Sequence, residues 1–104
     1  MIQALQTERF EKWLDELRDR HARLRIDKRI RRLELGNAGD YKSLGGGLLE
    51  LRISHGKGYR VYYTWRNSQL ILLLAGGDKS TQSKDIEMAR KLLKSIDKED
   101  TNDC

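Results

Sequence analysis

The sequence predicts one α+β domain with the element order β-α-α-β-β-β-α, in which helices pack on an antiparallel sheet. Its 104 residues suffice for one compact core and leave no room for a second domain. Apolar residues recur at helical spacing near both ends of the chain and alternate at strand spacing in the middle. We expect two N-terminal helices on one face of the sheet and a C-terminal helix. The domain should cover residues 1–97, with a polar, frayed tail over 98–104.

Three helices and a short first strand follow from the spacing of apolar residues. Residues 1–6 alternate loosely, as in a strand, and Thr7 is a suitable N-cap for a helix over about 8–19. A second helical pattern should end at Gly36, and a third covers about 82–97. The apolar stripes of the three helices are Phe10, Trp13, Leu14 and Leu17; Ala22, Ile26, Ile30 and Leu33; and Ile86, Ala89, Leu92, Leu93 and Ile96.

The central sequence reads as a glycine-rich connector followed by three strands. Residues 36–47 predict a flexible loop. Residues 48–54 and 59–65 alternate between apolar and polar positions, and this pattern places Trp65, like Trp13 in the first helix, on a buried face. Residues 70–75 are continuously apolar, as in a strand buried on both faces, and a tight turn at Asn67 and Ser68 precedes them.

The charge of the chain favours a polyanionic partner without demanding one. The net charge is +5 and the isoelectric point is near 9.5, which suits either binding to nucleic acid or a solubilising surface. The second helix concentrates this charge, and its basic residues form either a solvated face or an electrostatic footprint for RNA. They are Arg18, Arg20, Arg23, Arg25, Lys28, Arg29, Arg31 and Arg32.

Cysteine content and hydropathy predict a protein of the reducing cytoplasm. Cys104 is the single cysteine, so no disulfide can form within the chain. No apolar run has the length of a signal peptide or a membrane span. His21, His55 and Cys104 lack the spacing of metal ligands, and we predict no metal site and no cofactor.

The hairpin around Gly56 carries the main functional argument. Because the apolar residues of both strands must share a face, a turn centred on Gly56 pairs Arg52 with Arg60 and Glu50 with Tyr62. A register slipped by two residues keeps the same faces and makes Arg52 and Arg60 diagonal neighbours instead. Two like charges directly opposite each other on a sheet are destabilising. A polyanion bridging the two guanidinium groups would explain the arrangement, because arginine forks match phosphate oxygens. Alternatively, Glu50 neutralises the arginines through a salt bridge.

Other polar residues extend this surface. His55 and Lys57 lie at the turn and lengthen its positive edge, and His55 is a candidate for touching substrate or transferring a proton. Tyr62 shares the face of the arginines, so stacking on a nucleotide base is possible.

Several segments, in order and with characteristic spacing, resemble the RelE/ParE toxin superfamily. The resemblance is to its HigB-like addiction module killer branch, also described as phage-derived Gp49-like proteins, and it covers residues 1 to about 97. The segments that carry it are Phe10-x-x-Trp13-Leu14, Leu17-Arg18-Asp19, Gly36-Asn37-x-Gly39-Asp40, Glu50-Leu51-Arg52-Ile53, Gly58-Tyr59-Arg60-Val61-Tyr62-Tyr63, Leu72-Leu73-Leu74-x-Gly76-Gly77-Asp78-Lys79-Ser80-Thr81-Gln82, Asp85-Ile86 and Ala89.

The resemblance implies a ribonuclease-like sheet with helices on one face and the active site on the other. It implies a toxin that enters the ribosome and cleaves messenger RNA by attack of the ribose 2′-oxygen on the adjacent phosphate, without a metal. Arg52 and Arg60 match basic positions of the family, and Lys79 falls where RelE has an arginine. These three are the expected catalytic residues; Glu50, His55, Lys57 and Tyr62 are the expected substrate-binding residues.

The sequence departs from the RelE pattern at two positions. Glu50 stands where RelE has a second basic residue, and Asp85 stands near its functional tyrosine. The general base therefore stays open: Glu50, His55 or the ribosome itself are candidates.

Three functions follow from the resemblance. The first is a ribosome-dependent endoribonuclease, the second a ParE-type inhibitor of DNA gyrase, and the third a non-catalytic module that binds only its antitoxin. The implied partners are a HigA-like helix-turn-helix antitoxin, the ribosome and messenger RNA, with operator DNA bound only through the antitoxin complex and no membrane contact.

Overall fold

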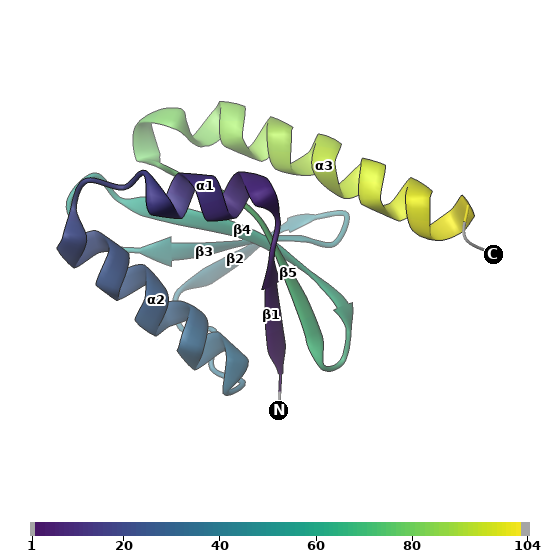
Figure 1. Cartoon of the computed structure of the whole chain (residues 1–104), viewed down its shortest axis with the longest axis horizontal. Coiled ribbons are helices and arrows are strands. Elements are labelled where there is room, and N and C mark those ends of the chain that lie inside the picture. Colours follow the sequence, from purple (N-terminus) through teal and green to yellow (C-terminus); the bar gives the residue numbers. More distant parts are fainter. Residues whose placement is uncertain (1, 103–104) are drawn as a thin grey trace.

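The computed structural model describes residues 2–102, with side chains up to residue 98, and has the predicted α+β architecture. Met1 and Asp103–Cys104, including the thiol and the end of the predicted tail, lie outside the described residues. The elements in chain order (Figure 1) are β1 Gln3–Gln6, α1 Glu8–Asp15, α2 Arg20–Glu34, β2 Tyr41–Gly45, β3 Leu48–Ile53, β4 Tyr59–Asn67, β5 Leu70–Asp78, the 3-10 turn η1 Lys79–Thr81 and α3 Gln82–Asn102.

The five strands form one sheet in the order β1-β5-β4-β3-β2. The neighbours among β2 to β5 are antiparallel, as predicted, whereas β1 is parallel to β5. A helix rather than a hairpin follows β1, so no tight turn forces it to be antiparallel. The Thr7 hydroxyl donates to the Leu74 carbonyl (2.8 Å), which attaches the end of β1 to the middle of β5.

One strand was missed by the sequence pattern. Residues 41–45, predicted as part of a flexible loop, form the edge strand β2 and pair with β3. Only Leu44 of this strand is even partly buried, so it has no alternating pattern that would reveal it. The Arg90 guanidinium of α3 donates to the carbonyls of Leu44 and Gly45, which holds this edge in place.

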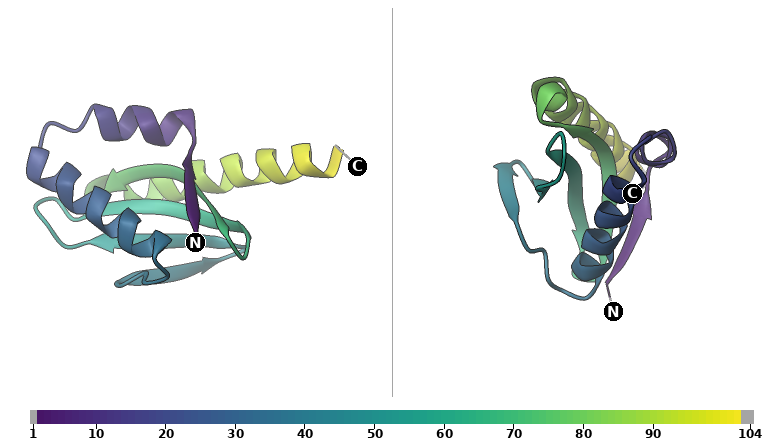
Figure 2. Two further views of the ribbon diagram at one scale, coloured as in Figure 1. Left: turned by 60° about the horizontal axis from the view of Figure 1, so that its bottom comes forward. Right: turned by 90° about the vertical axis from the view of Figure 1, so that its left-hand side faces the viewer.

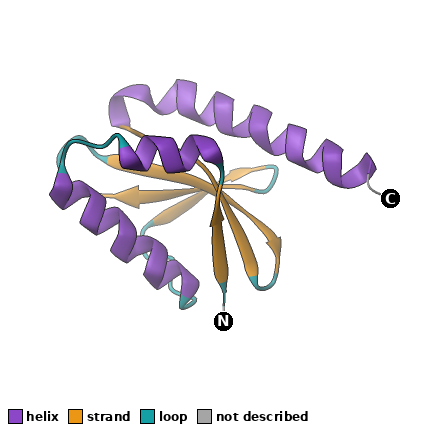
Figure 3. Cartoon of the chain, in the orientation of Figure 1, coloured by secondary structure: helices purple, strands orange, loops and turns teal. Residues whose placement is uncertain are grey.

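The sheet is covered by helices on both faces (Figures 2 and 3). α1 and α2 pack on the face formed by Leu51, Val61 and Leu73, as predicted. α3 packs on the opposite face, against Leu48, Tyr62 and Leu74. The second face is therefore not open along its whole length, in contrast to the arrangement implied by the family resemblance.

The helix boundaries differ from the predicted ones for local reasons. Thr7 caps α1 as predicted, by accepting from the amide of Phe10. α1 ends at Asp15 rather than near residue 19, because Asp19 is needed as the N-cap of α2 and accepts from the amides of His21 and Ala22. α3 continues to Asn102, beyond the predicted end at residue 97.

The two tryptophans are less buried than the sequence indicated. Trp13 is only partly buried, and its ring lies over Gly76 of β5. Trp65 is 40% exposed, because it lies near the end of β4 and lines a surface groove with Tyr41 and Leu49 rather than the closed core. The tight turn that follows lies at Ser68 and Gln69, one residue later than predicted.

Candidate active site

The β3–β4 hairpin has the register expected for a turn centred on Gly56 and not the one slipped by two residues. Arg52 pairs with Arg60 and Glu50 pairs with Tyr62. The five connecting residues form a compact turn in which the amide of Gly58 donates to the carbonyl of His55 (3.0 Å). Gly58 has a φ of +76°, a conformation that disfavours side chains. The two guanidinium groups therefore leave neighbouring strands side by side, near the tip of the hairpin.

Arg52, Arg60 and Lys79 line one pocket of about 360 Å³. We call it the cationic pocket; its other lining residues are Asp40, Ser54, His55, Gly56, Lys57 and Gly58. A methyl group built on Gly58 would lie 3.5 Å from Lys79 Cβ and 3.9 Å from Arg60 Nη1. Two distant segments, the hairpin and η1, thus place three cations around a single cavity that could hold an anionic group.

Glu50 lies beneath the arginines and is fully buried. Its Oε1 accepts from Arg52 Nε at 2.9 Å and lies 4.0 Å from Arg60 Nε, and its Oε2 accepts from Gln82 Nε2 at 2.8 Å. Burial raises the pKa of this carboxyl group, but the hydrogen bonds from Arg52 and Gln82 and the charges of both arginines lower the pKa below its ordinary value overall. The sequence left two explanations for the paired arginines, a bridging polyanion or a salt bridge to Glu50. The structure contains the salt bridge to Glu50.

The position of Glu50 corrects its predicted role in substrate binding. Its side chain has no solvent exposure, so it cannot touch an RNA strand lying in the pocket. The carboxylate of Glu50 instead attracts the guanidinium groups of Arg52 and Arg60 from the buried side of the pocket.

Arg29 of α2 fixes the backbone around the pocket. Its guanidinium donates to the carbonyls of Arg52 (2.6 Å), Ala38 (2.9 Å) and Asp40 (3.0 Å). This residue belongs to the basic stripe that was predicted either as a solvated face or as an RNA footprint. It serves neither purpose, because its hydrogen bonds are made inside the protein.

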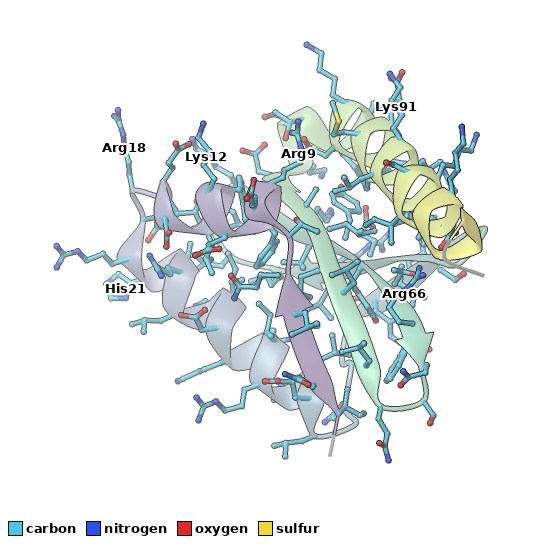
Figure 4. All side chains as sticks on the ribbon, turned by 45° about the vertical axis from the view of Figure 1, so that its right-hand side comes forward. Arg9, Lys12, Arg18, His21, Arg66 and Lys91 are labelled. Atoms are coloured by element: carbon cyan, nitrogen blue, oxygen red, sulfur yellow. The ribbon has the colours of Figure 1, made fainter. Side chains whose placement is uncertain are left out.

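Other basic residues do point outward. Arg9 and Lys12 project from α1, and Arg18 projects from the turn before α2 (Figure 4). These side chains remain available to a polyanion, in contrast to that of Arg29.

The loop that carries Lys79 is held by its own hydrogen bonds. Asp78 caps η1 by accepting from the amide and hydroxyl of Ser80, and these hydrogen bonds lower the pKa of its carboxyl group. The amide of Lys79 donates to the carbonyl of Lys57 at 3.3 Å. The loop and the hairpin tip are therefore joined directly through their backbones.

His55 forms an imidazole–carboxylate pair at the rim of the pocket. Its Nε2 lies 3.4 Å from Oδ2 of Asp19, the N-cap of α2. The hydrogen bond from the Ala22 amide is the main cause of the lowered pKa of Asp19, and His55 lowers it further. A carboxylate in this place can orient the imidazole ring.

Tyr62 is not available to stack on a base. It is fully buried under α3, and burial is the main cause of the strongly raised pKa of its hydroxyl group, followed by the charges of Glu50 and Asp85. The alternation that placed Tyr62 on the arginine face was correct, but the sequence could not show that α3 covers this part of the face.

Asp85 lies against Gly77, and its charge contributes to the raised pKa of Tyr62. It accepts from the Thr81 hydroxyl, and burial raises the pKa of its carboxyl group although that hydrogen bond opposes the effect. A carboxyl group whose pKa is raised by folding costs stability once the pH rises above its unfolded value, because the folded protein favours the protonated form.

Replacement of Asp85 by asparagine should therefore stabilise the protein at pH 7 and have little effect near pH 3. Asparagine keeps the size and can still accept from Thr81, but it carries no charge to desolvate. Urea unfolding of both proteins at the two pH values measures the effect. Equal midpoints at pH 7 would contradict the interpretation of Asp85.

A comparison with protein families identifies the family of this chain. A family model described as phage derived protein Gp49-like matches residues 12–94, which is most of the domain. The chain belongs to the Gp49-like family. This family is toxin–antitoxin-like, of the RelE/HigB type. Every residue that lines the cationic pocket lies within the matched segment of the Gp49-like protein.

One curated relative supports this assignment. It is an uncharacterized protein of Haemophilus influenzae, 48% identical over 95 residues, which cover 91% of this chain and 96% of the relative. The Gp49-like chain thus spans nearly the whole length of this relative. No solved structure matches it.

Between residues 2 and 102 no helix has both the length and the apolar character needed to cross a bilayer. Among the side chains that the structure describes, those of residues 2–98, no three or more His, Cys, Asp or Glu are grouped so that they could hold a metal ion.

Sequence reasoning missed Gln82, Arg29 and Asp19 as parts of the site. Gln82 stands at the end of the run after β5 that carries the family resemblance, but its uncharged side chain did not indicate a role in the site. Arg29 is one of many basic residues of α2, and Asp19 is a strong N-cap signal whose contact with His55 depends on the tertiary fold. Of the three, only Asp19 could have been singled out from the sequence, as the N-cap of α2.

Proposed function

We propose that this Gp49-like protein is the toxin of a type II toxin–antitoxin pair, a HigB-like endoribonuclease that cleaves messenger RNA on the ribosome. The observation that supports the proposal most is the cationic pocket, in which Arg52, Arg60 and Lys79 surround one cavity. Glu50 and Asp40 offset only part of the charge of Arg52, Lys57, Arg60 and Lys79, so the pocket keeps an excess of positive charge. A phosphate in the pocket would neutralise that excess.

The proposed reaction is attack of a ribose 2′-oxygen on the adjacent phosphorus atom. The 2′-hydroxyl loses its proton, the new P–O bond forms, and the bond to the 5′-oxygen breaks as that oxygen takes up a proton. The transition state carries an additional negative charge on the phosphoryl oxygens. Arg52, Arg60 and Lys79 stabilise that charge, and preorganised groups of this kind contribute about 10²–10³-fold each to the rate.

His55 is our choice for the proton-transfer residue. Of the two residues considered as general base, Glu50 is fully buried and accepts hydrogen bonds at both oxygens, whereas His55 lines the pocket. Asp19 orients the imidazole. Lys57, also in the pocket lining, is placed to contact a neighbouring phosphate of the strand.

Brief induction of the protein in bacteria tests the proposal. Translation should stop and transcripts should be truncated, and purified protein with ribosomes should yield fragments ending in a 2′,3′-cyclic phosphate. In the same assay, His55→Ala should lower the rate of cleavage by about 10²–10⁴-fold. DNA damage and filamentation would instead indicate inhibition of gyrase, and the absence of any growth arrest would indicate a non-catalytic antitoxin-binding module.

A partner follows from this function. We propose a HigA-like helix-turn-helix antitoxin that neutralises the protein in the cytoplasm and carries it to operator DNA. The exposed basic residues of α1 and α2 offer complementary charge to acidic residues of such a partner. A helix-turn-helix gene next to the gene of this protein, and co-purification of the two products, would support the pairing.

A further inference from the structure

We propose that Glu50 and Gln82 form a buried pair that positions Arg52 and Arg60 to bind a phosphate and couples them to the loop carrying Lys79. The inference deepens the proposed function and rests on it for the identity of the ligand as an RNA phosphate. Glu50 is then a positioning residue, which acts on the substrate only through the two arginines.

The direction of the hydrogen bonds is the first argument. Glu50 accepts from Arg52 through Nε and also lies closest to Arg60 through Nε. A guanidinium group held at Nε keeps its two Nη groups for a second anion. Glu50 therefore fixes the inner edge of Arg52 by a hydrogen bond and attracts that of Arg60 by charge at 4.0 Å, while one Nη of Arg60 donates to the Tyr59 carbonyl at 3.4 Å. The side chain of Arg52 is 35% exposed and that of Arg60 14% exposed.

The position of Gln82 is the second argument. Gln82 is the first residue of α3 and follows the η1 turn that carries Lys79. Its amide donates to the second oxygen of Glu50. The strands that carry the arginines and the loop that carries the lysine are thus linked by the same carboxylate, so the three cations keep a fixed spacing.

The incomplete hydrogen bonding around the pair is the third argument. Among the described residues, Arg60 Nε and the Tyr62 hydroxyl are buried and have no hydrogen-bond partner. Buried polar groups are normally satisfied. An arrangement selected only for stability would not bury a carboxylate with two arginines and leave these atoms unpaired, whereas one selected to hold cations for an incoming phosphate would tolerate it.

The test compares Glu50→Gln with the parent in binding adenosine 3′,5′-bisphosphate. Glutamine has the shape of glutamate and removes one negative charge next to the pocket. If the pocket attracted anions by charge alone, the variant would bind the bisphosphate more tightly. If Glu50 positions the arginines, the variant should bind about tenfold more weakly, as expected when a charge-assisted hydrogen bond is lost.

Two further variants separate positioning from folding. Gln82→Ala should weaken binding in the same direction, because Glu50 loses the hydrogen bond that fixes its second oxygen. Thr64→Val is the matched control: Thr64 is a buried polar residue of β4 whose hydroxyl donates to the Gly47 carbonyl, away from the pocket. It should lower the unfolding temperature without changing the affinity for the bisphosphate.

Binding that is unchanged or tighter in folded Glu50→Gln overturns the inference. So does a loss of affinity in Thr64→Val equal to that in Gln82→Ala, because it would then reflect general destabilisation. The binding assay needs no catalysis. If the parent binds the bisphosphate but cleaves no RNA, the proposed function fails while the positioning role of Glu50 is still decided by the affinities.

Discussion

Replacement of Arg60 by alanine should lower the rate of ribosome-dependent RNA cleavage by about 10²–10³-fold and abolish growth arrest. The guanidinium of Arg60 lines the cationic pocket and lies next to Gly58, where no side chain separates it from Lys79. Its removal deletes one of the groups that face the developing charge on the phosphate. The measurement is the single-turnover rate of cleavage on messenger RNA bound to ribosomes.

Two variants make the result specific. Arg60→Lys retains the charge but lacks the planar fork, so it should recover only part of the rate. Lys91→Ala removes a cation from the exposed face of α3, where Lys91 pairs with Glu87, and should cleave at the parental rate. Circular dichroism should be the same for all three variants, and an Arg60→Ala protein that is folded and as toxic as the parent would remove Arg60 from the site.

Replacement of Gly76 by alanine should destabilise the fold by about 1–3 kcal/mol, the usual cost of forcing an extra methyl group into a packed core. A Cβ at this position would overlap Cδ2, Cε3 and Cζ3 of the Trp13 ring. The ring cannot easily give way, because it also packs against Phe10 with a centroid separation of 5.7 Å. Urea or thermal unfolding followed by far-UV circular dichroism measures the loss.

A double-mutant cycle identifies the cause of that loss. In a Trp13→Leu background the added methyl group has more space, so Gly76→Ala should cost clearly less there than in the parent. The same penalty in both backgrounds would show that the ring is not the obstacle. Because Gly76 lies on the α1 face of β5, this pair also reports on how α1 is seated on the sheet.

The parity of the β3–β4 hairpin could be predicted from the sequence, whereas the choice between registers two residues apart could not. Leu51 and Val61 must both face α1 and α2, so Arg52 can only lie directly opposite Arg60 or diagonal to it, and the structure has the direct pairing. The same reasoning identified the cationic face. Lys79 is distant in sequence, and only the family resemblance indicated that it belongs to the same site. In the structure it lines the cationic pocket.

The environment of the site could not be predicted because it depends on contacts between elements. Glu50 could either neutralise the arginines or face the substrate, and only the packing of α3 decides the matter by burying it and bringing Gln82 to its second oxygen. The same helix removes Tyr62 from the surface. Arg29 could not be told from its basic neighbours, because its three carbonyl partners lie on other elements.

The parallel pairing of β1 with β5 has a consequence for synthesis of the chain. The amides of Gln3 and Thr7 donate to the carbonyls of Gln69 and Leu73, so the first strand has no place to dock until the last one has been made. The hairpins β3–β4 and β4–β5 need only local pairing and should form early, whereas β1 and the two helices after it must wait. Lys79 follows β5 directly. The docking of β1, α1 and α2 and the completion of the cationic pocket therefore become possible at nearly the same stage of translation.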